Sequence, residues 1–427
     1  MQYDIDNQWG EIILRFLFSH RNFPAQFRHM ITELGKDPKN EIVFLCNTQT
    51  PIEIKGVKKV LYKLKRKVPQ NAHRYLKQYE EAIIHGQGAA ESAIALKNSG
   101  FIPDIIYAHG WGNSMFFKDV FPDVPLINYC EWYYNSTGAD IGFDRIMPDY
   151  DKKALTRCNN SQFLQDLISC DLGICPTKWQ KSQFPKELQN KINVIHDGID
   201  TDYFIPNPDV EFKIPNSNVV LSCKDEVLTY ATRGMEPYRG FPQFMEIAEK
   251  LLQKRKNLHV VIAGEDKVCY GPKPRNGTFK EIMLKQLNFN EDKLKRLHFT
   301  GGLPYKEYRK LLQISSVHCY LTYPFVLSWS MLEAMATGCL IIGSKTQPVE
   351  EVIKDKQNGY LVNFYNIEEF AKTIDEILEA KANNGGIHSD KNQKIKMNAR
   401  KTIVDNYDLK KLLPRHIEMI KNTGFKK

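Results

Sequence analysis

Long apolar runs are missing from this chain of 427 residues. No stretch approaches the roughly 20 apolar residues that a membrane-spanning helix needs. The first residues (MQYDIDNQWGEIILRFLF) carry acidic groups ahead of a short apolar run, whereas a secretory signal begins with positive charge. We therefore expect a soluble, cytoplasmic protein.

Metal-binding and nucleotide-hydrolysing signatures are missing too. The nine cysteines form no C-x-x-C, the histidines form no H-x-x-x-H or H-E-x-x-H, and no G-x-x-x-x-G-K-S/T occurs. Several cysteines lie inside apolar, strand-like runs, where a thiol in a reducing compartment acts as a small core side chain (Cys46, Cys130, Cys175 and Cys319). We predict no metal site, no cofactor and no P-loop chemistry.

The composition is that of a globular protein, with 42% apolar and 11% aromatic residues, and the length suits two or three domains. The net charge is +9, and part of the excess lies within residues 55–67. That segment holds Lys55, Lys58, Lys59, Lys63, Lys65, Arg66 and Lys67. It is either a solvated face or a contact for an anionic partner, such as a lipid phosphate, the inner membrane surface or nucleic acid.

Short apolar runs alternate with amphipathic stretches along the chain. The predicted strands are 12–19, 41–46, 104–108, 125–130, 171–175 and 192–196, then 227–232, 258–264, 297–300, 317–322, 340–343 and 359–363. The predicted helices include 24–34, 241–255, 304–314 and 366–381, and 392–427 also has a helical pattern. This alternation predicts parallel sheets with helical crossovers. Residues 205–226, which hold three prolines, separate the two series, so we predict two doubly wound α/β domains, 1–204 and 205–405.

Three segments carry candidate chemistry. Arg233 and Arg239 follow a strand within a glycine-rich turn, where two guanidinium groups suit a diphosphate. Ser328 or Ser330 caps a helix that contains Glu333, so that helix start is a candidate anion site with a carboxylate nearby for a ribose diol. His109 follows a strand of the first domain, although a lone histidine there is more often structural.

Together these segments resemble the family 4 retaining glycosyltransferases of the GT-B fold, whose two Rossmann-like domains face each other across a cleft. The resemblance rests on the Arg233–Arg239 pair, the helix with Glu333, VIHDGID at 194–200 and His109, and it runs from about residue 18 to about residue 363. HRNFPAQFRH near the start and YPFVLSWSMLEAMATG near the end are similar to a bacterial subgroup of that family.

The resemblance implies roles for individual residues. Arg233 and Arg239 would neutralise the donor diphosphate, and Glu333, the second glutamate of the family's E-x7-E motif, would bind the ribose. His109 would lie near the sugar and the leaving diphosphate. The resemblance also implies that the last helix, about 406–427, packs back on the first domain.

Two departures from the family pattern concern the sugar. Phe325 stands where the first glutamate of E-x7-E is expected, and SHRNFPA at 19–25 replaces the usual Gly-Gly loop. The predicted catalytic residues are His109, Arg233 and Arg239. The predicted donor-binding residues are Arg233, Arg239, Gly264, Ser328, Trp329, Ser330 and Glu333. The predicted sugar or acceptor contacts are His20, Arg21, Trp111, Phe325, Val326 and Leu327.

The resemblance implies a metal-independent, retaining transfer of sugar from a UDP- or GDP-sugar to a glycan or lipid-linked acceptor in surface polysaccharide biosynthesis. The alternatives are a phage-type transferase acting on modified DNA bases, a nucleotide-sugar epimerase or hydrolase, and a nucleotide-sugar-binding protein weakened by Phe325. Three Asp-x-Asp triplets, at 4–6, 149–151 and 200–202, match the metal motif of the other large glycosyltransferase fold, and we discount all three as metal ligands.

Overall fold

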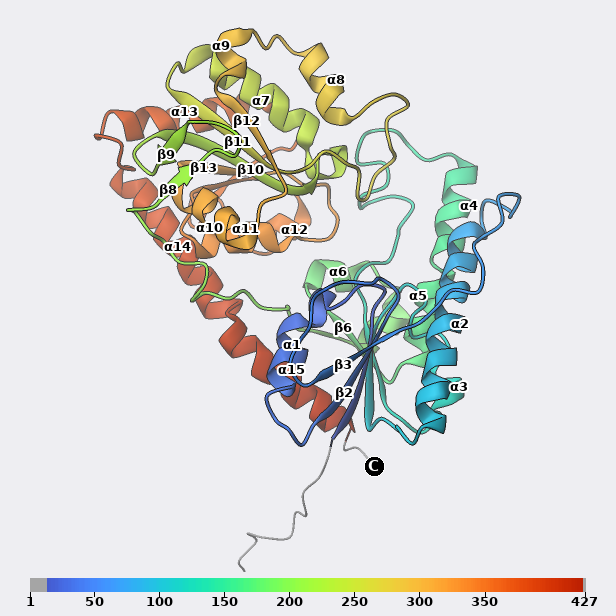
Figure 1. Cartoon of the computed structure of the whole chain (residues 1–427). Coiled ribbons are helices and arrows are strands. Elements are labelled where there is room, and N and C mark those ends of the chain that lie inside the picture. The colour runs from blue at the N-terminus through green and yellow to red at the C-terminus, as the bar shows by residue number, and fades with distance from the viewer. Residues whose placement is uncertain (1–13, 425–427) are drawn as a thin grey trace, which may run out of the picture. The chain divides into compact units, whose positions relative to one another are not determined.

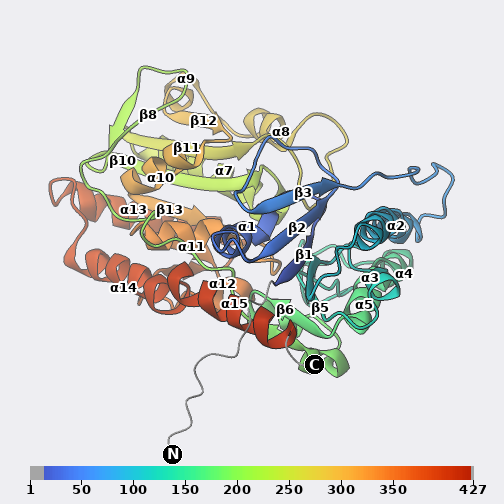
Figure 2. The ribbon, with the colours of Figure 1, turned by 60° about the horizontal axis from the view of Figure 1, so that its bottom comes forward.

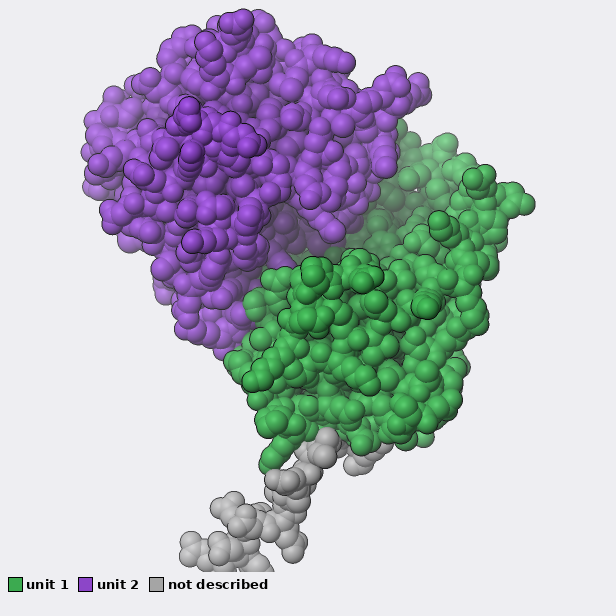
Figure 3. Space-filling view, viewed as in Figure 1, with its two compact units in different colours: residues 1–197, 412–427 green, residues 198–411 purple. Residues whose placement is uncertain are grey.

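The computed structural model describes residues 14–424 (Figure 1). The chain divides into two compact units, which Figure 3 colours separately. Unit 1 contains the residues up to Asp197 together with those from Leu412 onward, and unit 2 contains Gly198–Lys411. The first unit is therefore built from both ends of the chain, and the change of unit comes before residue 204 rather than after it.

Unit 1 contains a parallel sheet of seven strands. Their spatial order is β3 (Val57–Leu61), β2 (Glu41–Cys46), β1 (Arg15–Ser19), β4 (Ile105–His109), β5 (Leu126–Tyr129), β6 (Leu172–Cys175) and β7 (Ile192–Val194). The inner strands are buried along nearly their whole length, as strands covered on both faces should be.

Helices cover both faces of this sheet (Figure 1). One face packs against α1 (Arg28–Leu34) and against α15 (Leu409–Gly424), whose Ile420 is fully buried there. The other face packs against α2 (Lys77–Asn98), α3 (Phe117–Val120) and α5 (Ser161–Ser169). The remaining helical segments are η1 (Ala25–Phe27), α4 (Tyr150–Asn159), α6 (Lys178–Ser182) and η2 (Lys186–Lys191).

Unit 2 repeats the same plan with a parallel sheet of six strands. Their order is β12 (Leu297–Gly301), β11 (Leu258–Glu265), β10 (Glu226–Gly234), β13 (Val317–Tyr320), β14 (Ile341–Ser344) and β15 (Tyr360–Val362). The central strands β10 and β13 lie where the strand order reverses, which is where doubly wound sheets bind ligands.

The helices of unit 2 also form two layers. On one face, α10 (Tyr305–Ile314), α11 (Trp329–Ala336) and α14 (Asp390–Asn406) share a core with the sheet, and α11 lies beside α14 in Figures 1 and 2. On the other, α7 (Phe241–Lys254) packs against α13 (Ile367–Ala382). The remaining segments are η3 (Pro237–Arg239), α8 (Phe279–Gln286), α9 (Glu291–Leu294) and α12 (Gln347–Glu350).

The structure confirms the predicted fold class, with a strand in each predicted strand segment. The first of these is described only from residue 14. The segment 205–226, predicted as a connection, instead forms an antiparallel hairpin of β8 (Glu211–Lys213) and β9 (Val220–Ser222) within unit 2. Phe212 and Leu221 explain the difference, because both are buried in the core of that unit.

The basic segment 55–67 contains the edge strand β3, which is not among the predicted strands. Several of its cations are paired: Lys59 with Glu53, Lys65 with Glu91 and Arg66 with Glu80. The positive charge available to a partner is therefore smaller than the sequence indicates.

Between residues 14 and 424, no helix combines the length and the apolar character that crossing a membrane requires.

Candidate functional site

The two predicted arginines flank a short turn at the carboxyl end of β10. Arg233 is exposed and makes no hydrogen bond or ion pair with the residues that the structure describes. Arg239 ends η3, and Gly240 follows with a left-handed φ of 65° before α7 begins. A Cβ at position 240 would lie 2.4 Å from the Cβ of Leu321, so only glycine fits at this close approach.

Arg239 is held in place from several sides although it is only 6% exposed. Its Nη1 donates to Thr322 Oγ1 and to the Val326 carbonyl oxygen, both at 2.9 Å. The guanidinium carbon lies 5.0 Å from the centre of the Tyr270 ring, within range of a cation–π contact. The protein therefore fixes this cation before any ligand arrives.

Helix α11 begins beside these residues. The Ser328 side chain is its N-cap and accepts a hydrogen bond from the Ser330 N–H at 3.3 Å. The N–H of Ser328 donates to the Tyr320 hydroxyl at 3.0 Å, which ties the helix start to β13. The first turn of a helix leaves backbone N–H groups without intrahelical partners, so this end favours an anion.

A small pocket of about 30 Å³ brings these groups together. Arg233, Arg239, Ser328 and Ser330 line it, with Tyr230, Ala231, Thr232, Tyr270, Tyr320 and Leu321. None of these lining residues is acidic, so the two guanidinium groups give the pocket lining its positive charge. The chemistry of its lining suits an anionic group such as a phosphate, and most of a larger ligand would lie outside this small pocket.

Other predicted donor-binding residues do not line this pocket. Gly264 lies in β11 with a φ of 146°, and a Cβ there would lie 2.3 Å from the carbonyl oxygen of Thr232. It therefore permits the close approach of β11 to a strand that lines the pocket. Trp329 is the first residue of α11 and is 36% exposed. Val326 and Leu327, which were predicted as sugar or acceptor contacts, do not line the pocket either: Val326 supplies a carbonyl to Arg239, and Leu327 is buried in the core.

Glu333 is buried within α11 and also does not line the pocket. Its carboxylate accepts a hydrogen bond from the Tyr305 hydroxyl. Burial raises the pKa of this carboxyl to about 7, while the hydroxyls of Tyr305 and Tyr308 act in the opposite direction. Tyr305 therefore lies against Glu333, the residue predicted to bind a ribose.

Phe325 replaces the expected glutamate with an aromatic contact. Its ring is 4% exposed and meets the rings of Tyr238 and Tyr270 edge-on, with centroids 5.3 Å apart in each pair. Tyr270 lines the pocket, so Phe325 supports the pocket wall from behind.

In unit 1, His109 ends β4 next to β1 and is 3% exposed. Its Nε2 lies 3.4 Å from the Gln26 amide nitrogen and 3.7 Å from the Glu131 carboxylate. Its ring stacks on Tyr129 at 5.1 Å, and the His20 ring meets it edge-on at 4.6 Å. Burial lowers the pKa of His109 to about 4, so the imidazole is neutral at pH 7.

Arg21 and Trp111 complete the predicted residues of unit 1. Arg21 Nη2 donates to the Trp111 carbonyl at 2.8 Å, and its Nη1 pairs with Glu81 at 2.9 Å. Trp111 has a left-handed φ of 69°, and its ring meets that of Phe163 edge-on at 5.0 Å. The structure thus gathers His20, Arg21, His109 and Trp111 beyond the carboxyl ends of β1 and β4, and Arg21 holds a strained backbone there.

Three residues near the site were not predicted. Tyr270 lines the pocket, and Glu236 accepts a hydrogen bond from the Tyr270 backbone N–H. The third residue, Tyr305, donates a hydrogen bond to Glu333. A carboxylate midway between two arginines was a usable signal for Glu236. Tyr270 and Tyr305 lie far along the chain from the groups they touch, so no local pattern marked them.

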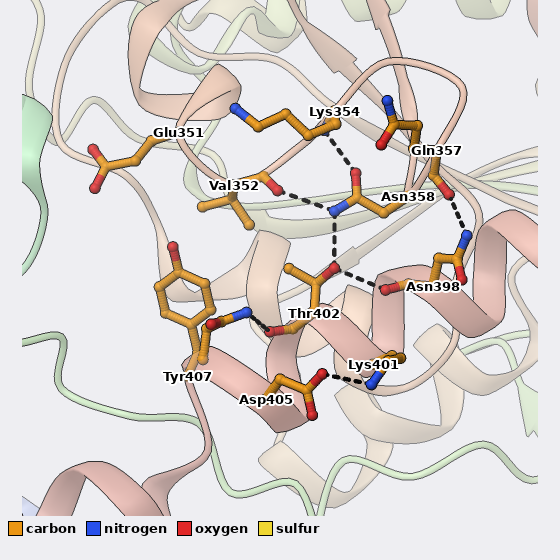
Figure 4. Close-up of a pocket in the computed structure, with 11 residues that line it drawn as sticks. Glu351, Val352, Lys354, Gln357, Asn358, Asn398, Lys401, Thr402, Asp405 and Tyr407 are labelled. Atoms are coloured by element: carbon orange, nitrogen blue, oxygen red, sulfur yellow. Dashed lines mark hydrogen bonds and ion pairs between the residues drawn. The ribbon is translucent and has the colours of Figure 1, made fainter.

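A larger pocket, of about 510 Å³, lies elsewhere in unit 2 between residues 351–358 and the end of α14 (Figure 4). Its polar groups mostly bond to one another: Asn398 donates to the Gln357 carbonyl, Asn358 to Thr402, and Lys401 pairs with Asp405. It contains none of the predicted site residues.

The Asp-x-Asp triplets have structural partners where they are described. Asp149 caps α4, Asp151 pairs with Arg74, and Asp200 accepts from the Tyr203 N–H at 2.9 Å. The triplet at 4–6 lies outside the described residues. Within residues 14–424, no group of three or more metal-ligating side chains could hold an ion.

Doubly wound domains bind ligands, nucleotides among them, at the carboxyl ends of their strands, where the basic pocket of unit 2 lies. Residues 38–204 match the family model described as glycosyl transferase family 4 group, and residues 217–402 match that of glycosyl transferases group 1. This chain is therefore a GT-B glycosyltransferase of the group 1 and family 4 type.

Solved structures share this fold along nearly the whole chain. A glycosyltransferase from Rickettsia africae ESF-5 is 15% identical, with a TM-score of 0.65 over 97% of this chain and 99% of that one. Sucrose-phosphate synthase from Thermosynechococcus elongatus is 10% identical, with a TM-score of 0.69 over 96% of this chain and 98% of that one. Anabaena Alr3699/HepE in complex with UDP is 13% identical, with a TM-score of 0.63 over 96% of this chain and 100% of that one. At these identities the likeness establishes the fold. Among curated proteins, none matches this sequence.

Proposed function

We propose that this chain transfers a sugar from a UDP- or GDP-sugar to a glycan or lipid-linked acceptor of a surface polysaccharide, with retention of configuration and without a metal ion. The small pocket of unit 2, which we call the donor pocket, carries this proposal, because it joins Arg233, Arg239 and the start of α11 at one place.

The chemistry of the transfer matches that arrangement. As the sugar leaves, negative charge develops on the nucleoside diphosphate. Arg239 is already fixed by Thr322 and Val326, and Arg233, which makes no hydrogen bond or ion pair with the described residues, is available for the phosphate oxygens. With the positive end of the α11 dipole, these groups stabilise the charge that a divalent cation would otherwise neutralise.

His109 is the catalytic residue that we assign in unit 1. Its imidazole is neutral at pH 7 because burial lowers its pKa to about 4. A neutral ring can donate or accept a hydrogen bond with a sugar hydroxyl without adding a charge.

Two neighbours in fold support a UDP-sugar as the first donor to test. Alr3699/HepE from Anabaena has been solved with UDP and with UDP-glucose. A point mutant of TarM from S. aureus has been solved with UDP and alpha-GlcNAc-glycerol. Both are similar to this chain in fold, at 13–18% identity.

A donor panel tests the proposal directly. The protein is incubated with UDP- and GDP-sugars, with and without glycan, lipid and DNA acceptors, and release of free nucleoside diphosphate is measured. We expect acceptor-dependent release with one donor class, and the anomeric configuration of the product gives the stereochemistry. Nucleotide binding without turnover on any acceptor would instead support the alternative function, a nucleotide-sugar-binding protein in which Phe325 has replaced the expected glutamate.

The metal requirement is tested with EDTA. Because two guanidinium groups and a helix start carry the charge stabilisation, we expect the transfer rate to survive EDTA. A strict need for Mn²⁺ or Mg²⁺ would contradict the proposed mechanism.

A further inference from the structure

Glu236 stands between the two arginines of the donor pocket but pairs with neither. Its side chain is fully buried, and it accepts hydrogen bonds from three consecutive backbone N–H groups of a distant loop. The distances are 2.9 Å from Cys269, 3.0 Å from Tyr270 and 2.7 Å from Gly271. The carboxylate therefore uses its hydrogen-bond acceptors on this loop and forms no ion pair with either guanidinium group, although its charge still acts on Arg239 from a distance.

The loop sits closely on the turn that carries the arginines. A Cβ on Gly234 would lie 2.6 Å from the Lys267 carbonyl oxygen, and a Cβ on Gly271 would lie 3.1 Å from the Tyr238 ring. The Met235 N–H also donates to the Glu265 carbonyl at 3.1 Å. Glycine at both positions allows this approach, and Glu236 then fixes the loop from inside.

The fixed loop places the Tyr270 ring in the pocket. The ring lies 5.0 Å from the guanidinium carbon of Arg239, forms part of the pocket lining and rests against Phe325. Tyr270 is 39% exposed, so packing alone holds it weakly, and the backbone hydrogen bonds to Glu236 set its position.

We infer that Glu236 is a positioning residue for donor binding, which fixes the 269–271 loop so that Tyr270 forms an aromatic wall against Arg239 while Glu236 itself forms an ion pair with neither arginine. This rests on the proposed function, because it concerns the same donor pocket. Glu236 acts through Tyr270 and Arg239 and does not itself line the pocket.

Calorimetric titration of the full chain with UDP and with GDP tests this role. Glu236→Gln puts an amide N–H₂ against three N–H donors, so we expect nucleotide affinity to fall by about tenfold. Tyr270→Ala should lower it by roughly three- to tenfold, and Tyr270→Phe, which keeps the ring but loses the hydroxyl that interacts with Arg239, should lower it less. The double variant Glu236→Gln/Tyr270→Ala should be little weaker than Glu236→Gln, because both changes remove the same contact.

A matched control is Asp225→Asn. Asp225 also holds a backbone turn of unit 2, accepting from the Ser222 N–H at 2.7 Å, but it lies outside the pocket. Its nucleotide affinity should be unchanged. Hydrogen exchange of the 269–271 amides gives a second measurement, which should speed up in Glu236→Gln and not in the control. If Glu236→Gln does not fold, Tyr270→Ala changes a partly exposed side chain and tests the wall alone.

The outcomes separate this inference from the proposed function. Wild-type protein that binds neither nucleotide overturns both. Binding that Arg239→Ala weakens, but that folded Glu236→Gln or Tyr270→Ala leaves unchanged, overturns only the positioning role. Independent, multiplying effects in the double variant would also overturn it.

Discussion

The two arginines of the donor pocket have different environments. Arg233 is exposed and unpaired among the described residues, whereas Arg239 is buried and bonded to Thr322 and Val326. The first is free to follow a ligand, and the second is held in one position. Loss of either removes charge stabilisation, but only loss of Arg239 also leaves buried acceptors without a donor.

Substitution of each arginine by alanine tests this difference. We expect Arg233→Ala and Arg239→Ala each to lower turnover by on the order of 10²-fold, as loss of one charge-stabilising donor does. Only Arg239→Ala should also lower the melting temperature. Arg275→Ala, which removes an exposed arginine of the same unit outside the pocket, serves as the control. Unchanged rates in both pocket variants would contradict the site.

The raised pKa of Glu333 predicts that nucleotide affinity depends on pH. Burial raises the pKa of this carboxyl to about 7, so it gains its charge as pH rises through neutrality. If the carboxylate binds a ribose diol, nucleotide affinity should increase over that range. Tyr305→Phe removes a hydroxyl that lowers the pKa of Glu333, so the midpoint should move to higher pH. An affinity independent of pH between 6 and 8 would argue against a ribose contact; this pH range is about one unit either side of the pKa.

At the scale of elements, the β10–η3–α7 connection determines where Arg239 lies. Its sharp turn depends on Gly240, whose left-handed φ of 65° starts α7 directly after η3. The strands of the β8–β9 hairpin carry only one buried residue each, between exposed or half-buried neighbours. In the sequence, strands this short cannot be told from a loop, whereas a glycine between a strand and a helix indicates a sharp turn.

Gly240→Ala measures how much the turn contributes. A left-handed alanine costs about 1 kcal/mol, and overpacking against Leu321 adds roughly 1–3 kcal/mol of unfolding free energy. Gly385 is a matched control, because its φ of 64° is nearly the same and a Cβ there would meet nothing within 4 Å. Denaturant unfolding should show the larger loss for Gly240→Ala, and only that variant should weaken nucleotide binding. Equal losses would mean that the contact with Leu321 is unimportant.

At the scale of the whole molecule, buried histidines make stability depend on pH. Burial lowers the pKa of His85, His109, His298 and His318 to about 4, and that of His196 and His388 to about 3. Between about pH 6.5 and pH 4 the unfolded chain binds protons at these sites and the folded chain does not, so stability falls as pH falls. Asp166 and Glu333, whose burial raises their pKa to about 6 and 7, oppose this trend.

The melting temperature should therefore drop when the pH is lowered from about 7 to about 5, because six histidines outweigh two carboxyl groups. Thermal unfolding in a series of buffers at constant ionic strength checks this. A melting temperature that rises on acidification would show that the raised carboxyl groups dominate.

Much of the fold and part of the site could be predicted from the sequence. The strand segments of both sheets were visible because a buried parallel strand must be apolar along its length, which is a local property. Arg233, Arg239, Ser328 and Ser330, which the structure brings to one pocket, could be named from the sequence because they lie near the end of a strand or at a helix start. β3 was missed because its lysines, such as Lys58, give this edge strand the polar composition that is typical of a solvated loop.

The sequence by itself determined two doubly wound domains and the basic character of the donor pocket, because periodicity and residue type express both. Only the tertiary structure decided that Glu236 holds the loop of Tyr270 and that Tyr305 covers Glu333. Each of these contacts joins segments far apart in the chain. Such pairings are selected by the packing of the whole fold, and no local spacing records them.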